Sequence, residues 1–276
     1  MSYNGLPFDD SLIPSLQSVK DRIKLNKAAM IIIDGGVGEG KTTLACHIAE
    51  WYQPGWVENR SEELLAMGGK AFLKSLDVSV KKKDRVVVYD EAGDFNSRGA
   101  LTYFNQNLNR VFETYRQTQK LIILCLPDSS DIDRNLFKKR IPRMVINTYD
   151  RNDKYGNYRV YSLWRAWYLH EKMKKLTVPP QAYSIVTPNL FGHFKDLDPE
   201  EREVIGKISM KGKRQIIQKS YLNQKGLIDI EEIGRRTGYS KASLYPKLRD
   251  LECESVGRKK YWDKSVVEKL LAEKKR

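Results

Sequence analysis

The sequence predicts an α/β fold in which buried parallel strands carry the functional residues at their ends. Three short apolar runs occur at 28–33, 86–89 and 121–126, and continuous runs of this kind are typical of strands buried on both faces. A glycine-rich loop follows the first run, and residues 44–51 then show the apolar stripe of a helix. This succession of strand, loop and helix predicts a parallel-sheet core.

The loop at 34–43 has the spacing of a Walker A phosphate-binding motif, Gly-x4-Gly-Lys-Thr. Its glycines allow backbone N–H groups to turn inward around a polyphosphate, and the following helix adds its positive N-terminal dipole. Lys41 is expected to reach the β- and γ-phosphates, and Thr42 to offer its hydroxyl to Mg²⁺. The predicted nucleotide-binding residues are Gly35, Gly36, Val37, Gly38, Glu39, Gly40, Lys41, Thr42 and Thr43.

The segment 85–91 reads as a β-branched strand that ends in two adjacent carboxylates, which is the Walker B pattern. Asp90 is expected at the carboxyl end of a strand beside the loop, where it can hold the hydration shell of Mg²⁺. Glu91 is then placed to activate a water molecule for attack on the γ-phosphate. Small-molecule kinases need no such base, and the Asn-Lys-x-Asp signature of GTPases is absent. The sequence therefore predicts ATP hydrolysis, with ATP and Mg²⁺ as cofactors and Lys41 and Glu91 as catalytic residues.

The other elements of the predicted core follow from apolar spacing and turn residues. Helices are expected at 15–25, at 61–67 with Ser61 as N-cap, at 70–76, and from 99 or 100 to 119. A short basic helix at 131–140 precedes strands at 142–147 and 158–165, joined by a hairpin turn at 151–157. After the strand at 121–126, Asp128 or Ser129 can serve as a γ-phosphate sensor, although ordinary turn chemistry explains both residues as well.

The C-terminal part of the chain predicts a second, smaller domain. Residues 170–199 contain several prolines and show no clear helical or strand periodicity, which predicts a linker or wrapping segment. Helical patterns follow at 200–208, 214–224, 229–237, 241–251 and 263–272, with a glycine turn, a Ser240 N-cap and a two-stranded wing at 254–262. This layout resembles winged helix-turn-helix domains. The expected organisation is a lead-in at 1–27, an ATPase domain at 28–169, the linker at 170–199 and the winged domain at 200–276.

Charge indicates a polyanionic partner. The chain has a net charge of +14, and residues 200–276 hold 20 Lys and Arg against 12 Asp and Glu, which is more than half of the excess. In winged domains the second helix enters the major groove and the wing meets phosphates or the minor groove, although such domains also serve protein contacts. The predicted contacts with DNA, expected to be double-stranded, are Tyr239, Ser240, Lys241, Ser243, Tyr245, Lys247, Arg258, Lys259 and Lys260.

Composition excludes several other classes. No stretch approaches the ~20 apolar residues of a membrane span, and residues 1–5 lack the pattern of a secretory signal. Cys46, Cys125 and Cys253 lie far apart without metal-ligand spacing, so buried small side chains explain them better than a metal site. We therefore expect a cytosolic protein without a membrane anchor.

Residues 28–165 resemble the FtsK–HerA branch of P-loop ATPases, and specifically the zonula occludens toxin-like ATPases of phages, archaeal viruses and plasmids. The resemblance lies in Asp90-Glu91-Ala92-x-x-Phe95, a helix ending at 115–118, an apolar strand, and the segment 130–134. It implies a RecA-like (ASCE) core assembled as a homo-oligomeric ring that moves or packages DNA. The branch commonly has a Gln where this chain has Leu126-Pro127-Asp128. A neighbouring subunit would supply an arginine finger, for which the candidates are Arg140 and Arg143, then Arg98, Arg110 and Arg116.

Two alternatives to a DNA motor stay open. A replication-initiation or helicase-loading ATPase would use its nucleotide state to gate assembly on DNA. A nucleotide-switched DNA-binding regulator or partition protein would hydrolyse ATP slowly, as a timer. Turnover separates these hypotheses, because only a motor hydrolyses ATP many times for each DNA that it engages.

Overall fold

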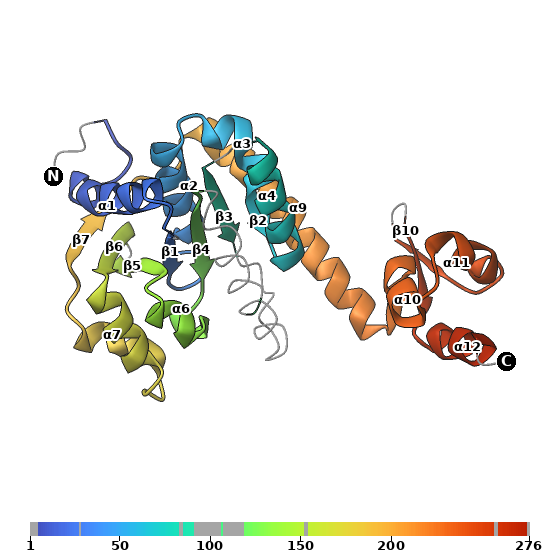
Figure 1. Ribbon diagram of the computed structural model, residues 1–276. Helices are drawn as coiled ribbons and strands as arrows, with labels where there is room; N and C mark the ends of the chain where they lie inside the picture. The colour runs from blue at the N-terminus through green and yellow to red at the C-terminus, as the bar shows by residue number, and fades with distance from the viewer. Residues whose placement is uncertain are drawn as a thin grey trace. The chain divides into compact units, whose positions relative to one another are not determined.

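The computed structural model describes residues 5–27, 29–82, 85–90, 106, 119–151, 154–256 and 259–274 (Figure 1). The chain divides into two compact units, residues 1–212 and 213–276, and each is described by itself. The boundary between them lies at 212/213, whereas the sequence placed it at 199/200. Residues 199–224 form one continuous helix, α9 (Pro199–Gln224), so the two expected helices at 200–208 and 214–224 are joined.

The first unit is built on a seven-stranded sheet with the order β2-β3-β4-β1-β5-β6-β7. Its strands are β1 (Ala29–Asp34), β2 (Leu65–Met67), β3 (Val86–Asp90), β4 (Leu121–Leu126), β5 (Pro142–Arg151), β6 (Lys154–Ser162) and β7 (Leu190–His193). The first five strands in spatial order pair in parallel, and β6 and β7 add antiparallel at one end. The predicted α/β fold with a mostly parallel sheet is confirmed, and the sheet is consistent with a RecA-like core.

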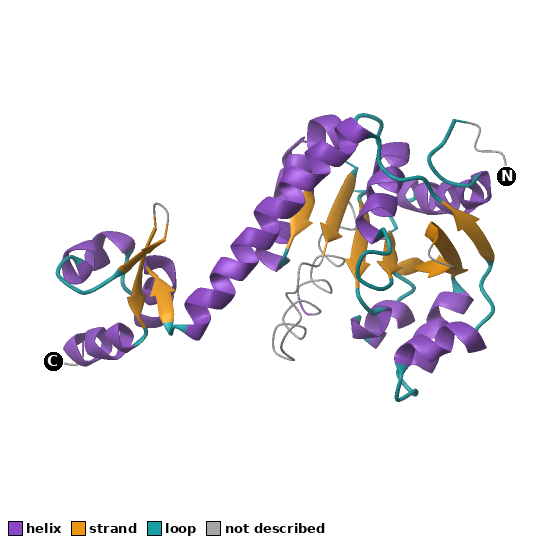
Figure 2. Ribbon diagram, turned by 180° about the vertical axis from the view of Figure 1, so that it is seen from behind, coloured by secondary structure: helices purple, strands orange, loops and turns teal. Residues whose placement is uncertain are grey.

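Helices flank this sheet (Figure 2). They are α1 (Ile13–Lys24), α2 (Lys41–Tyr52), α3 (Trp56–Leu64), α4 (Gly69–Lys82), α6 (Arg134–Lys138), α7 (Trp164–Met173) and α8 (Ala182–Ile185), with 3₁₀ turns at Asp10–Leu12, Ser129–Asp131 and Pro179–Gln181. Every residue of β1 and of β4 is buried, as expected for strands covered on both faces. The predicted helix at 99–119 falls mostly outside the described residues.

Helix α2 packs across three neighbouring strands of the sheet. It contacts β1, β4 and β3, so it crosses the strand that separates β1 from β3. In register, Asp34 at the end of β1 lies opposite Leu126 of β4, and Cys125 of β4 lies opposite Asp90 of β3. The carboxyl ends of all three strands therefore meet at one edge of the sheet, below the first turn of α2.

The helix predicted at 61–67 is wrong at both ends. Ser61 does not cap a helix at 61–67, because α3 begins at Trp56 and the buried Ser61 hydroxyl donates to the carbonyl of Val57. Residues 65–67 leave the helix and form β2, which pairs in parallel with β3. Pairing with residues 23 positions away in the chain overrides the local helical preference of this apolar segment.

The segment at 170–199, expected as a linker or wrapping segment, is largely folded onto the first unit. Its first residues complete α7, and β7 pairs antiparallel with β6. The strand expected at 158–165 ends at Ser162, because Leu163 has a φ of +50° and α7 begins directly after it. Within the described residues, no helix has both the length and the apolar character needed to cross a membrane.

The second unit has the predicted order of elements. After α9 come β8 (Leu227–Asp229), α10 (Ile230–Thr237), α11 (Lys241–Leu248), β9 (Glu254–Val256), β10 (Lys259–Asp263) and α12 (Ser265–Lys274). The strands form an antiparallel sheet in the order β8-β10-β9, and Ile233, Leu244 and Trp262 belong to a buried core. Gly238 ends α10 with a φ of +74°, and the Ser240 side chain accepts from the N–H of Ser243. The assignment of this unit as a winged helix-turn-helix stays a prediction.

Candidate nucleotide-binding site

The phosphate loop connects β1 to α2 and turns sharply at Gly40. Gly40 has a φ of +80° and serves as the N-cap of α2 without any side-chain cap. A Cβ atom on this glycine would lie 2.5 Å from the hydroxyl oxygen of Tyr155 and 2.7 Å from Cζ of Phe194. Tyr155 also donates a hydrogen bond of 3.0 Å to Oγ1 of Thr43. The β5–β6 hairpin therefore packs against the loop where the helix begins.

A matched pair of glycine substitutions tests this packing. Gly40→Ala is expected to lower the free energy of unfolding by about 1–3 kcal/mol more than Gly38→Ala. Both positions have positive φ, +80° and +87°, so both alanines carry the same backbone strain. Only Gly40 has neighbours within reach, because a Cβ on Gly38 meets nothing within 4 Å. Urea denaturation of both variants gives the difference, and equal losses would contradict the close approach of Tyr155.

The interior of the loop has the donors that an anion needs. The Lys41 ammonium donates to the carbonyls of Gly35 (2.8 Å) and Gly36 (2.6 Å), which points it into the loop. The N–H of Gly36 donates to the carboxylate of Glu39. A loop N–H thus already binds an anionic oxygen from the chain itself, and a phosphate oxygen presents the same chemistry. With the uncapped start of α2, the loop fits a polyphosphate.

One hydrogen bond joins the two Walker motifs. Thr42, in the first turn of α2, donates from Oγ1 to Oδ2 of Asp90 over 2.8 Å. The residues are 48 positions apart in the chain and meet because α2 crosses β4. A hydroxyl and a carboxylate at this distance supply the oxygen ligands that Mg²⁺ prefers when it keeps several waters. Glu91 lies outside the described residues.

Behind the loop lies a buried polar cluster that sequence reasoning missed. Asp34 ends β1 and is fully buried. Its carboxylate accepts hydrogen bonds from the Tyr183 hydroxyl, from the Ser129 N–H (3.2 Å) and from Nδ2 of Asn147 (3.1 Å). Burial raises the pKa of Asp34, although these three hydrogen bonds act against that shift. The only sequence signal was an acidic residue closing an otherwise apolar strand.

Arg159 extends this cluster across the sheet. Its Nε donates to Oδ1 of Asn147 over 2.8 Å, and its guanidinium lies 4.4 Å from the ring centroid of Tyr183. The Thr148 hydroxyl donates to the backbone carbonyl of Asp34 (3.2 Å), directly before the first loop glycine. The start of the phosphate loop is therefore fixed to β5, β6 and α8 by side chains far apart in the sequence.

The two sensor candidates sit beside this cluster. Asp128 accepts from the N–H of Ser130 over 2.7 Å, as a cap of the 3₁₀ turn. Ser129 is buried, and its hydroxyl donates to the sulfur of Met173 over 3.3 Å. Both residues thus have structural partners, and their role as sensors stays a prediction. Arg140 and Arg143 lie at the start of β5, and Arg98, Arg110 and Arg116 lie outside the described residues.

In the second unit, the predicted DNA contacts differ in their exposure and partners. Lys241 pairs with Glu231 (2.8 Å) and Lys247 with Glu273 (2.9 Å), and such exposed ion pairs are weak enough for a phosphate to replace. Tyr245, Lys259 and Lys260 are exposed, whereas Tyr239 packs on the unit's core and the hydroxyls of Ser240 and Ser243 bond to each other. Arg258 lies outside the described residues.

Comparison with known proteins leaves the chain without an assigned family. No family model matches it, and no curated protein matches it. Among solved structures, the chain is similar to one described as "crystal structure of DNA replication initiation factor", with 15% identity and a TM-score of 0.32. The match covers 85% of this chain and 72% of that chain. So low a score carries no argument about function.

Proposed function

We propose that this chain is a Mg²⁺-dependent ATPase that acts on DNA. The observation that carries the proposal is the hydrogen bond between Thr42 and Asp90, which brings a Walker A hydroxyl and a Walker B carboxylate together beside the Lys41 ammonium. A structural role alone would not require a lysine turned into a glycine-rich loop at the start of an uncapped helix.

Each residue has a defined task in this proposal. The loop N–H groups and Lys41 bind the phosphates and neutralise charge on them. The Thr42 hydroxyl and the Asp90 carboxylate would hold Mg²⁺. When bound, the ion would stabilise the negative charge on the phosphoryl group. Tyr155 and Phe194 hold the loop at Gly40, and the Asp34 cluster holds its first residue. Glu91, next in the chain after Asp90, orients and deprotonates the attacking water.

Glu91→Gln is expected to keep ATP binding while lowering the hydrolysis rate at least about 100-fold. The amide preserves the size of the side chain but cannot take a proton from water, and general bases contribute about 10²–10⁴ to rate. Phosphate release at saturating ATP measures the loss, and a fluorescent ATP analogue measures binding. Glu58→Gln, on α3, is the control. Normal turnover in Glu91→Gln would place the base elsewhere.

The DNA role is tested by the steady-state ATPase rate of the full chain with and without linear double-stranded DNA. A motor of the FtsK–HerA branch, acting as a homo-oligomeric ring, should be strongly stimulated by any DNA. If the second unit binds the DNA, its stimulation of the ATPase rate should fall in a variant carrying Lys259→Glu and Lys260→Glu. A slow ATPase rate that non-specific DNA does not change would favour a replication-initiation or helicase-loading ATPase, or a nucleotide-switched DNA-binding regulator.

A further inference from the structure

The edge of the sheet opposite the phosphate loop carries a row of cations. Parallel strands start at a common edge, and here a basic residue stands at or just before the start of four of them. Lys27 precedes β1, Arg85 precedes β3, Lys120 precedes β4, and Arg143 is the second residue of β5. The register places these starts side by side, since Leu121 pairs with both Ala29 and Val86, and Met30 pairs with Pro142.

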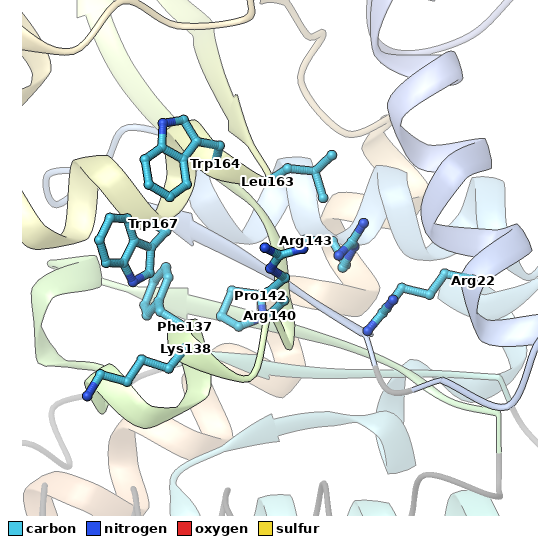
Figure 3. A pocket seen from close by; sticks show the side chains of 9 residues that line it. All are labelled: Arg22, Phe137, Lys138, Arg140, Pro142, Arg143, Leu163, Trp164 and Trp167. Carbon is cyan, nitrogen blue, oxygen red and sulfur yellow. The ribbon is translucent and has the colours of Figure 1, made fainter.

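A cavity of about 660 Å³ opens at the β5 end of this row (Figure 3). It is lined by four cations, Arg22, Lys138, Arg140 and Arg143, and by two indole rings, Trp164 and Trp167. In the view of Figure 3 the indoles lie on one side, Arg22 lies on the other, and Arg140 and Arg143 lie between them. The cavity therefore has an aromatic side formed by the indoles and a positively charged side formed by the arginines.

Of the two indoles, Trp164 is exposed to solvent and Trp167 is half-buried against the core. The rings of Trp164 and Trp167 stack with centroids 4.8 Å apart and planes 25° apart, and Trp164 is 66% exposed. Leu163, at a φ of +50°, turns the chain from β6 into α7 and so sets Trp164 in the first turn of that helix. Large aromatic side chains are seldom left this exposed, and a stacked pair offers a platform for another flat ring.

Three of the four cavity cations, Lys138, Arg140 and Arg143, lie without an ion pair to a carboxylate across the described ranges of the chain. Burial and the like charges of Arg22 and Arg140 lower the pKa of Arg143. Asp21 lines the adjoining hollow, where Gln17 and Lys24 already donate to its carboxylate. An anion in the cavity would relieve this mutual repulsion.

We propose that this cavity binds a single-stranded nucleic acid, with a base stacked on Trp164 and its flanking phosphates on Arg140 and Arg143. A base in a duplex keeps both faces covered by its neighbours, so an indole platform selects unpaired bases. The strand continues along the row of cations, because the adjoining hollow contains Lys27 and shares Arg22 and Arg143 with the cavity. A further hollow beside α1 is lined by Lys20, Lys24, Arg85 and Lys120.

The test measures binding of a short oligothymidine to the full chain, by anisotropy of a labelled strand and by quenching of tryptophan fluorescence. Trp164→Ala is expected to weaken binding about tenfold and to remove most of the quenching. Arg140→Glu is expected to weaken binding to a similar extent and to reduce its salt dependence. Lys41→Ala should bind the oligonucleotide as the unchanged protein does, because the phosphate loop lies at the opposite edge.

Two matched controls separate the cavity from general effects. Tyr168→Ala removes another exposed aromatic ring of α7, and Lys139→Glu reverses the charge next to Arg140, but neither residue lines the cavity. Both should change affinity by less than about twofold. Unchanged affinity and quenching in Trp164→Ala would overturn the proposal. Equally tight binding of free thymidine monophosphate would overturn the assignment to a strand, and a loss of ATPase in Arg140→Glu with normal oligonucleotide binding would favour the arginine finger.

Discussion

Replacing Lys41 with alanine is expected to abolish measurable ATP binding and to lower ATPase activity at least about 100-fold. The ammonium is held inside the loop by the carbonyls of Gly35 and Gly36, where it would meet the β- and γ-phosphates. Alanine removes the one positive charge that the loop itself provides, and no neighbouring side chain of the loop can replace it. Titration calorimetry with Mg²⁺-ATP and a phosphate-release assay measure the two losses.

The control for this prediction is Lys81→Ala. Lys81 is exposed on α4 and pairs with Asp77, so its loss should leave ATP binding within about twofold of normal. Circular dichroism should show that Lys41→Ala remains folded, because among the described residues the Lys41 ammonium bonds only to the carbonyls of Gly35 and Gly36. If Lys41→Ala still bound Mg²⁺-ATP with normal affinity, the assignment of residues 35–43 as a phosphate loop would fail.

The parallel core could be predicted because its signal is local. Residues 121–126 were expected as a strand and form β4 with the same bounds, since six consecutive apolar residues between a lysine and a proline favour a short buried strand. β1 and β3 each end one residue later than their apolar runs, because Asp34 and Asp90 still pair with neighbouring strands. In all three strands the information lies within six adjacent residues, and burial on both faces leaves no room for polar alternation.

Elements that depend on distant partners could not be predicted in this way. Leu65–Met67 becomes β2 only because β3 offers an open edge, and Leu190–His193 becomes β7 only because β6 does. Neither segment has an alternating pattern of its own. Proline residues around β7 favoured a linker or wrapping segment. In the structure Pro188 lies between α8 and β7, whereas Pro179 and Pro180 begin the 3₁₀ turn before α8.

In the candidate site, too, the residues in contiguous motifs could be predicted and those brought together from distant parts of the chain could not. The loop at 35–43 and Asp90 were predicted because each motif is contiguous, and their meeting through Thr42 follows from the strand–loop–helix order. The support behind the loop was not predicted, since Asn147, Arg159 and Tyr183 lie more than 100 residues from Asp34 in the chain. Only the folded sheet brings these four side chains together.

Asp34→Ala is expected to lower the free energy of unfolding by about 3–5 kcal/mol. Removing the carboxylate leaves the Tyr183 hydroxyl, the Ser129 N–H and the Asn147 amide without their shared acceptor in a fully buried place. An unsatisfied buried donor costs about 1–3 kcal/mol, so the loss of three partners outweighs any gain from removing a buried charge. Urea denaturation followed by circular dichroism measures the change.

Asp21→Ala is the matched control. The Asp21 carboxylate accepts two hydrogen bonds, compared with three for Asp34, but it lies on the surface of α1. Its loss should cost less than about 1 kcal/mol. Since Asp34 directly precedes the loop, the unfolding transition of Asp34→Ala should also respond less to Mg²⁺-ATP than that of Asp21→Ala. Equal stabilities of the two variants would mean that water, rather than Asp34, satisfies the donors around Tyr183, and that the cluster does not position the phosphate loop.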